Sequence, residues 1–231
     1  MWGKARVPAV VIKPRVYLVG GPELTYYLDA YFYAIITERE NIILIDSGCG
    51  RGYINTLRNI LELGLSPRKV KYIINTHCHV DVSGGDYYFY NAFNTTVIAH
   101  EPDSLIIQQG DCEKTLARKL NLDFKPTPVS ISLRGAYEKI VIDDVELQIY
   151  HCPGHTNGSI LILATIDQSN ILFGGDTITR SNGEFKVELH SGCVDKLLNL
   201  NYETACFNRF YIRYKAREFI ERILTKRRYP L

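Results

Sequence analysis

Apolar residues occur along the chain in short runs that end in turn-forming or polar residues, a pattern typical of buried β-strands. In the first half the runs are Val7–Ile12, Arg15–Val19, Tyr31–Thr37, Asn41–Ile45, Val70–Asn75 and Thr96–Ala99. In the second half they are Val129–Leu133, Lys139–Ile142, Val145–Tyr150, Ser159–Thr165 and Ile171–Phe173. The pattern therefore predicts two β-rich halves.

Helical periodicity is clearest near the C-terminus, where apolar residues recur at spacings of three and four. These residues are Ile212, Ala216, Phe219, Ile220, Ile223 and Leu224. Weaker helix candidates lie between the predicted strands, at Gly52–Leu63, Gly84–Asn91, Asp103–Leu120 and Gly192–Leu200. The chain has no low-complexity linker and no internal repeat. We therefore expect a single α/β (α+β) domain over residues 1–231, with two β-sheets inside and helices outside.

Composition and charge limit the kinds of partner and substrate that the protein can have. The chain has 231 residues, of which 46% are hydrophobic, so it can bury a substantial core. Its 27 Lys and Arg against 25 Asp and Glu argue against nucleic acid or a membrane as the main partner. A small-molecule substrate fits better, while the oligomeric state stays open. Charged residues interrupt the N-terminal apolar run, so we expect no signal peptide and a cytoplasmic location. The six cysteines are scattered and are expected to be free thiols.

Three possible metal ligands alternate directly after the strand that ends near Asn75. They are His77, His79 and Asp81 in the segment THCHVDVSGG. If the chain stays extended there, these side chains project to the same side while Cys78 and Val80 point away. Histidine and aspartate in one cluster are the donors that suit zinc or iron(II).

Two further clusters follow predicted strands in the second half of the chain. The segment HCPGHT contains His155, and the segment FGGDT contains Asp176. A divalent metal requires several nitrogen and oxygen donors brought from separate parts of the chain onto a rigid frame. The clusters are therefore candidates for one shared metal site.

The order THCHVDVSGG, then CPGHT, then FGGDT resembles the metallo-β-lactamase superfamily, and the upstream IILIDSG, which contains Asp46, is similar to it as well. The resemblance implies a four-layer αββα sandwich of two mixed β-sheets. It implies that His77, His79 and His155 bind a first metal, with Asp176 as the bridging carboxylate. Asp81 corresponds to a ligand of the second metal, and Asp46 to a residue that supports the ligands.

The chain departs from this family at the second metal site. The histidine that normally follows the aspartate is replaced by Val82, and the last histidine ligand is absent from the segment Tyr202–Arg209. His190 is the only histidine after Asp176 and is expected on the surface. His100 is expected at a strand end, and His151 either supports the site or is simply packed. We therefore expect one metal ion per chain, zinc or alternatively Fe²⁺.

The resemblance implies a metal-dependent hydrolase of a small ester, thioester or lactone. A metal held by the three histidines and Asp176 would keep one position for an activated water molecule. Asp81, freed from full ligation, would act as the catalytic group that accepts a proton from this water. Two alternatives remain: a mononuclear non-haem iron enzyme similar to persulfide dioxygenases, and a non-catalytic metal-binding protein.

Overall fold

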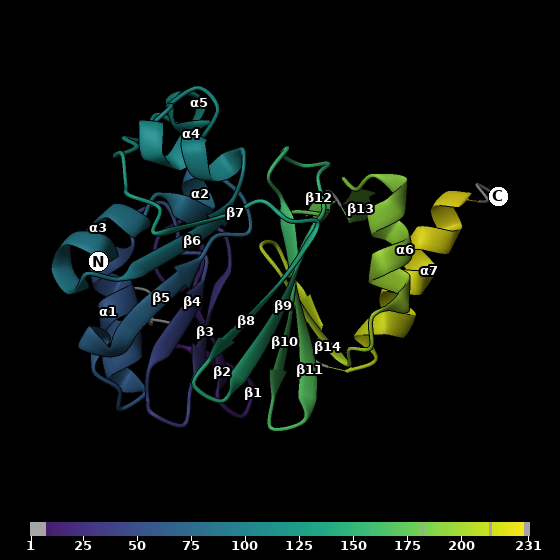
Figure 1. Ribbon diagram of the computed structural model, residues 1–231, viewed down its shortest axis with the longest axis horizontal. Coiled ribbons are helices and arrows are strands. Elements are labelled where there is room, and N and C mark those ends of the chain that lie inside the picture. The colour runs from purple at the N-terminus through teal and green to yellow at the C-terminus, as the bar shows by residue number, and fades with distance from the viewer. Residues whose placement is uncertain (1–7, 182, 213, 229–231) are drawn as a thin grey trace, which may run out of the picture.

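Two β-sheets packed face to face form the centre of the molecule (Figure 1). The computed structural model describes residues 8–181, 183–212 and 214–228. The first sheet has its strands in chain order, antiparallel from β1 to β4 and parallel from β4 to β7. Its strands are β1 (Val10–Lys13), β2 (Val16–Gly20), β3 (Phe32–Ile36), β4 (Ile42–Ile45), β5 (Val70–Ile74), β6 (Thr96–His100) and β7 (Ile131–Leu133).

The second sheet has the order β15-β14-β11-β10-β9-β8 and is antiparallel except for the parallel pair β11 and β14. Its strands are β8 (Tyr137–Ile142), β9 (Val145–His151), β10 (Ile160–Ile166), β11 (Ser169–Gly175), β14 (Thr204–Phe207) and β15 (Tyr211–Ile212). A separate hairpin pairs β12 (Ile178–Ser181) with β13 (Glu184–Val187). Both large sheets are mixed, as the sequence predicts.

Helices cover the outer faces of both sheets (Figure 1). On the side of the first sheet lie α1 (Tyr53–Glu62), α2 (Val80–Ser83), α3 (Asp86–Phe93), α4 (Asp103–Gln109), α5 (Ala117–Leu120) and the 3₁₀ turn η1 (Pro67–Lys69). On the side of the second sheet lie α6 (Ser191–Asn199) and α7 (Ala216–Arg228). This arrangement confirms the predicted αββα sandwich. Within the described residues, no helix is long and apolar enough to cross a membrane.

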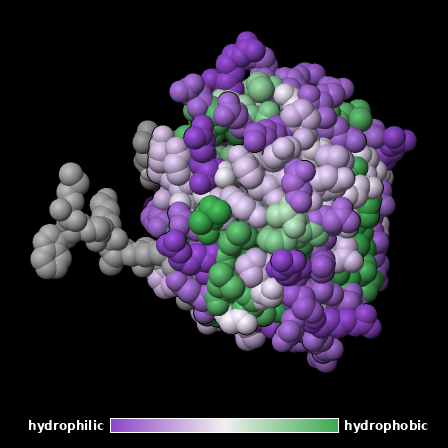
Figure 2. Space-filling model, turned by 90° about the vertical axis from the view of Figure 1, so that its left-hand side faces the viewer, coloured by the Kyte–Doolittle hydropathy of each residue, from purple (hydrophilic) through white to green (hydrophobic). Residues whose placement is uncertain are grey.

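The main core lies between the two sheets and takes residues from both. Phe32–Ile36 and Ile42–Ile45 are buried at every position, because these strands have the second sheet on one face and helices on the other. This explains their continuous apolar sequence. On the outside, Figure 2 shows both polar and apolar residues on the α1 and α3 side, with some of the apolar ones adjoining one another. Ile54 and Leu61 of α1 are exposed. The six cysteines are free, as expected.

Several predicted elements differ from the structure. The region Asp103–Leu120 is two short helices, because α4 ends at Gln109 and the following Gly110 takes the left-handed conformation with φ 66°. Ile212 belongs to β15, so the C-terminal helix begins only at Ala216. Strands β12 to β15 were not predicted, since they are short and contain no run of large apolar residues like the one in β4. Val7, the predicted start of the first strand, lies outside the described residues.

Candidate metal centre

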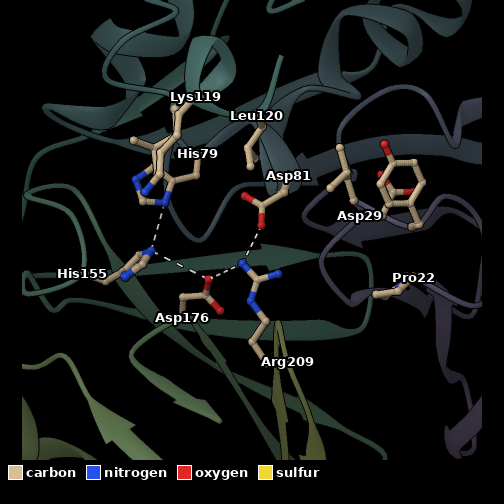
Figure 3. Close-up of a pocket in the computed structure, with 12 residues that line it drawn as sticks. Pro22, Asp29, His79, Asp81, Lys119, Leu120, His155, Asp176 and Arg209 are labelled. Atoms are coloured by element: carbon tan, nitrogen blue, oxygen red, sulfur yellow. Dashed lines mark hydrogen bonds and ion pairs between the residues drawn. The ribbon is translucent and has the colours of Figure 1, made fainter. Parts of the chain in front are cut away.

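The loops that follow four strands meet at one end of the two sheets. Strand β5 leads to His77 and His79, β9 to His155, β11 to Asp176 and β14 to Arg209. The first of these strands belongs to one sheet and the other three to the second sheet. The site therefore combines both halves of the sandwich, and Figure 3 shows four of these side chains facing a common space.

The three predicted imidazole ligands converge on one another. The rings of His77, His79 and His155 have centroid separations of 4.7 Å for every pair and lie at 82 to 89° to each other. One nitrogen of each ring lies within 4.8 Å of the other two. The Nε2 atom of His155 is 2.9 Å from Nδ1 of His79. Three nitrogens that face one point from nearly perpendicular rings form a group able to hold a metal ion.

The protonation state of these rings suits a metal ion. Burial, reinforced by the neighbouring imidazoles, lowers the pKa of His77 well below its usual value, and burial lowers the pKa of His79 to about 4. Both rings are therefore neutral at neutral pH and carry a lone pair. The Nε2 atom of His77 is buried and has no hydrogen-bond partner within the described part of the chain. A metal ion would bind the lone pair of this nitrogen, so the residues present fit a metal ion.

The metal loop bends at Thr76 and His77 and does not stay extended through Asp81. His79 caps the short helix α2, and Asp81 lies in the first turn of that helix. The extended geometry expected through Asp81 is therefore wrong. His77 and His79 still share a side, while Cys78 and Val80 are buried in an apolar cluster behind the loop. The helix directs Asp81 to a separate place beside the triad.

Asp46 contacts the metal loop through one intermediate residue. Its carboxylate accepts hydrogen bonds from the backbone N–H of Thr76 at 2.7 Å and from the Thr76 hydroxyl. The same hydroxyl lies 3.1 Å from Nδ1 of His77. Burial raises the pKa of Asp46 to about 7, against the lowering effect of the hydrogen bonds from Asn208 and Thr76. The structure thus places Asp46 where it can orient His77 through Thr76.

Asp81 and Asp176 lie beside the triad and share a cation. The Nη2 atom of Arg209 is 2.5 Å from Oδ2 of Asp81 and 2.9 Å from Oδ2 of Asp176 (Figure 3). Asp176 Oδ2 is also 3.8 Å from Nε2 of His155, whereas its Oδ1 is buried and unpaired among the described residues. Burial opposes the charge of Arg209, but the two carboxylates outweigh it and raise the pKa of the guanidinium.

Arg209 is a site residue that the sequence analysis missed. The segment Tyr202–Arg209 was noted only for the histidine it lacks, and nothing local to the segment indicates where an arginine side chain will point. Its contact with Asp81 spans 128 positions of sequence. The available signal was a permanently charged residue at the place where the family pattern expects a metal ligand.

Asp103 is a second missed residue and connects two of the ligand loops. Its Oδ2 accepts hydrogen bonds from the backbone N–H of Cys78 and the hydroxyl of Thr156, and its Oδ1 accepts one from the N–H of Gly158. Cys78 lies between two of the metal-loop histidines, and Thr156 follows His155 directly. Asp103 is almost completely buried, at 1% exposure. One carboxylate therefore holds both loops in a fixed relation.

Glu188 is a third missed residue and supports His155. Its Oε2 lies 2.6 Å from Nδ1 of His155, and Lys186 pairs with its other oxygen. Burial opposes ionisation, but Lys186 and His155 outweigh it and lower the pKa of Glu188. An ionised acceptor places the imidazole proton on Nδ1, which leaves the lone pair on Nε2 toward the other two rings. A Cβ at Gly154 would lie 2.2 Å from the Glu188 carbonyl oxygen, so the loop can approach only with glycine there.

Replacing Glu188 with glutamine should weaken zinc binding about tenfold, because His155 loses a charged acceptor that fixes its tautomer. Competition between the protein and a chromogenic chelator measures this affinity. Glu184→Gln is the matched control, since Glu184 is an exposed residue of β13 nearby. Equal affinities of wild type and Glu188→Gln would mean that the contact does not support the ligand.

The remaining histidines lie outside the triad. His100 stacks on His151 with ring centroids 4.0 Å apart, and both rings contact backbone carbonyl groups. His190 is exposed and precedes helix α6. These three residues therefore belong to strand ends and to the surface.

A cavity of about 300 Å³ opens beside the triad and the Arg209 contacts. Its polar wall contains His79, His155 and the two site aspartates, and its apolar wall contains Pro22, Leu28, Leu116 and Leu120. Tyr27 and Lys119 stand at its exposed edge. Unlike Tyr27, Tyr33 does not line the cavity. It is buried in the core, where its hydroxyl donates to the Phe207 carbonyl. A small organic molecule fits a cavity of this size.

Comparison with known proteins identifies the family. The profile of the Metallo-beta-lactamase superfamily matches residues 27–207, which include every candidate ligand. The chain belongs to this superfamily. Together with the histidine triad, this membership indicates a metal ion at the site and identifies the protein as a metallo-hydrolase.

Curated relatives agree with this class. A probable metallo-hydrolase of Methanocaldococcus jannaschii is 33% identical over 176 residues, which cover 74% of this chain and 80% of that protein. An N-acyl homoserine lactonase of a Bacillus species is 27% identical over 69% of this chain and 68% of its own length. A hydroxyacylglutathione hydrolase of Pelagibacter ubique is 28% identical over 65% of this chain and 52% of its own length.

Solved structures share the fold. The FEZ-1 metallo-beta-lactamase of Legionella gormanii superposes with a TM-score of 0.74 at 17% identity and covers 95% of this chain and 94% of that chain. A metallo-beta-lactamase of Cronobacter sakazakii reaches 0.73 at 22% identity, over 98% of this chain and 86% of its own. At these identities the likeness concerns the architecture.

Proposed function

We propose that the protein hydrolyses a small ester, thioester or lactone with one zinc ion per chain. The observation that carries the proposal is the convergence of three imidazoles beside a cavity of small-molecule size. Two relatives are named for acyl substrates, a homoserine lactone and a hydroxyacylglutathione, and they support the substrate class. We expect neither nucleic acid nor a membrane to be a partner of the protein.

His77, His79 and His155 would hold the metal, and Asp176 would complete the ligand set. Asp176 suits this role because its buried Oδ1 atom has no partner within the described residues. When bound, a divalent metal lowers the pKa of a water molecule to about 7 and polarises a carbonyl group. Glu188, Asp103 and Thr76 would keep the three rings aimed at one point, so that no ligand has to reorganise.

Asp81 would accept the proton that the attacking water loses. Its contact with Arg209 uses Oδ2, which leaves Oδ1 for a proton. The side chain is only 9% exposed, so bulk water competes little for it. The apolar residues of the cavity would hold the acyl or leaving group beside these polar atoms and exclude water from the remaining space.

A paired reconstitution experiment tests this proposal. Metal-free protein is loaded separately with zinc and, without oxygen, with iron(II). We expect the zinc form to hydrolyse members of a thioester, ester and lactone panel, and the iron form to consume little oxygen with glutathione persulfide. The reason is that three histidines and a carboxylate leave one position for water, whereas oxygen chemistry needs adjacent positions for dioxygen and sulfur.

The outcomes separate the three candidate functions. Rapid persulfide-dependent oxygen uptake by the iron form, without hydrolysis by the zinc form, would favour a dioxygenase. In that case His79 would leave the metal, and His77, His155 and Asp176 would form the ligand triad. Inactivity of both forms would favour a binding protein. His155→Ala is the matched inactive control, and His190→Ala should behave as wild type.

A further inference from the structure

The guanidinium of Arg209 lies between two buried carboxylates from different halves of the fold (Figure 3). Asp81 and Asp176 are 6% and 3% exposed. Two carboxylates this close and this buried need a cation between them, because desolvation and mutual repulsion both oppose ionisation. We propose that Arg209 takes the place of a second metal ion in this site and donates its remaining N–H groups to an oxygen atom of the substrate.

The residues around the two aspartates suit a guanidinium better than a metal. Val82 is completely buried and offers no donor atom at the position where the family pattern has histidine. Within the described residues of the site, the group of side chains that could hold a metal is the triad His77, His79 and His155, and the two aspartates are not part of it. Asp81 and Asp176 retain the carboxylates of a second site without its imidazoles, and Arg209 pairs with one oxygen of each.

The position of Arg209 is set by its neighbour Asn208. The Asn208 side chain donates to Asp46 at 2.7 Å and to the Tyr31 carbonyl at 2.9 Å. Its backbone N–H donates to Gly175 at 3.0 Å, and its carbonyl accepts from the N–H of Tyr31 at 2.8 Å. The backbone before Arg209 is therefore bonded to both sheets. This fixes the point from which the Arg209 side chain starts, and the two carboxylates hold its guanidinium.

Arg209 lines the cavity together with the two carboxylates and is the most exposed of the three side chains. Its side chain is 37% exposed, against 9% for Asp81 and 2% for Asp176. Both carboxylate contacts use the Nη2 atom, and Figure 3 shows the other terminal nitrogen pointing away from them toward the Asp29 and Pro22 side of the cavity. Within the described part of the chain the other guanidinium nitrogens have no hydrogen-bond partner, so they are suited to bind a carbonyl or carboxylate oxygen in the cavity.

The first test is metal stoichiometry, which does not depend on catalysis. Wild type and Arg209→Lys should each bind one zinc in calorimetric titration and elemental analysis. Val82→His alone should also bind one, because the guanidinium still occupies the space between the aspartates. The double change Val82→His with Arg209→His should bind a second zinc, at least about tenfold more tightly than Val82→His alone.

Two zinc ions in wild type, or equal second-site affinity in Val82→His and the double variant, would overturn the proposal. Because Val82 is buried, the double variant is also checked for folding by thermal unfolding. Arg209→His alone provides a second measure, since it removes the cation and adds an imidazole without altering the core. It too should bind more zinc than wild type, and one zinc in this variant would count against the proposal.

The second test is hydrolysis, and this part rests on the proposed function. Arg209→Met should lower kcat/KM about a hundredfold while the first zinc stays bound, because a fixed donor to the substrate is lost. Arg209→Lys should lie between Arg209→Met and wild type. Arg39→Met is the matched control, since Arg39 pairs with Asp143 on an exposed surface. Unchanged kcat/KM in Arg209→Met would mean that Arg209 only pairs with the two aspartates and does not bind the substrate. If wild type hydrolyses nothing, the proposed function fails, and the stoichiometry alone decides the role of Arg209.

Discussion

Replacing His77 with alanine should abolish tight zinc binding and, with it, hydrolysis. His77 is the most buried of the triad, at 1% exposure, and its Nε2 atom has no partner within the described residues. Loss of one imidazole from a set of three leaves too few nitrogen donors for tight binding. We expect the affinity to fall by more than about a hundredfold, beyond the effect of changing a supporting residue. Elemental analysis after dialysis against a weak chelator measures the retained zinc.

The comparison with another histidine makes this result specific. His190→Ala removes an exposed imidazole outside the triad and should keep its zinc. Thermal unfolding of metal-free His77→Ala should show a folded protein, because the loop is also held by Thr76 and Asp103. Full retention of zinc by folded His77→Ala would show that the triad is not the metal site.

Replacing Asp103 with asparagine should weaken zinc binding about ten- to a hundredfold and lower the free energy of unfolding by about 3 kcal/mol. The carboxylate accepts three hydrogen bonds from the loops of Cys78, Thr156 and Gly158. An amide can accept at only one atom, so at least one donor would face its NH₂ group inside the protein. The two ligand loops would then separate. Chelator competition and denaturant unfolding measure the two effects.

Asp111→Asn is the matched control for this change. Asp111 also accepts backbone hydrogen bonds, from Glu113 and Lys114, but its side chain is partly exposed and bonds within its own turn. That turn contacts the metal loop through the backbone of Thr115, which does not involve the Asp111 carboxylate. It should lose no zinc affinity and less than about 1 kcal/mol of stability. If Asp103→Asn lowers stability but leaves zinc affinity unchanged, the carboxylate holds the fold without positioning the ligands.

Most of the two large sheets could be predicted from sequence, because their strands are continuous apolar runs such as Phe32–Ile36 and Ile42–Ile45. The strands that were missed are short and lack a run of large apolar residues. β14 reads Thr-Ala-Cys-Phe, whereas β4, of the same length, reads Ile-Ile-Leu-Ile. The local failure at Asp81 has the same origin. A single helical turn, α2, begins within the metal loop, and four residues cannot reveal it in a sequence.

The sequence by itself predicted two β-sheets with helices outside, because strand periodicity is a local property of the chain. Its motifs, which are also local, resembled the family, and this resemblance implied the αββα fold and the three histidine ligands. The sequence also determined the loss of two second-site imidazoles, which is visible at Val82 and in the segment Tyr202–Arg209. Only the tertiary structure decided what lies in their place. Arg209 meets Asp81 and Asp176 because β14 pairs with β11 in one sheet while α2 extends from the other. A contact made where two sheets meet depends on packing across the whole sandwich, and no local pattern encodes it.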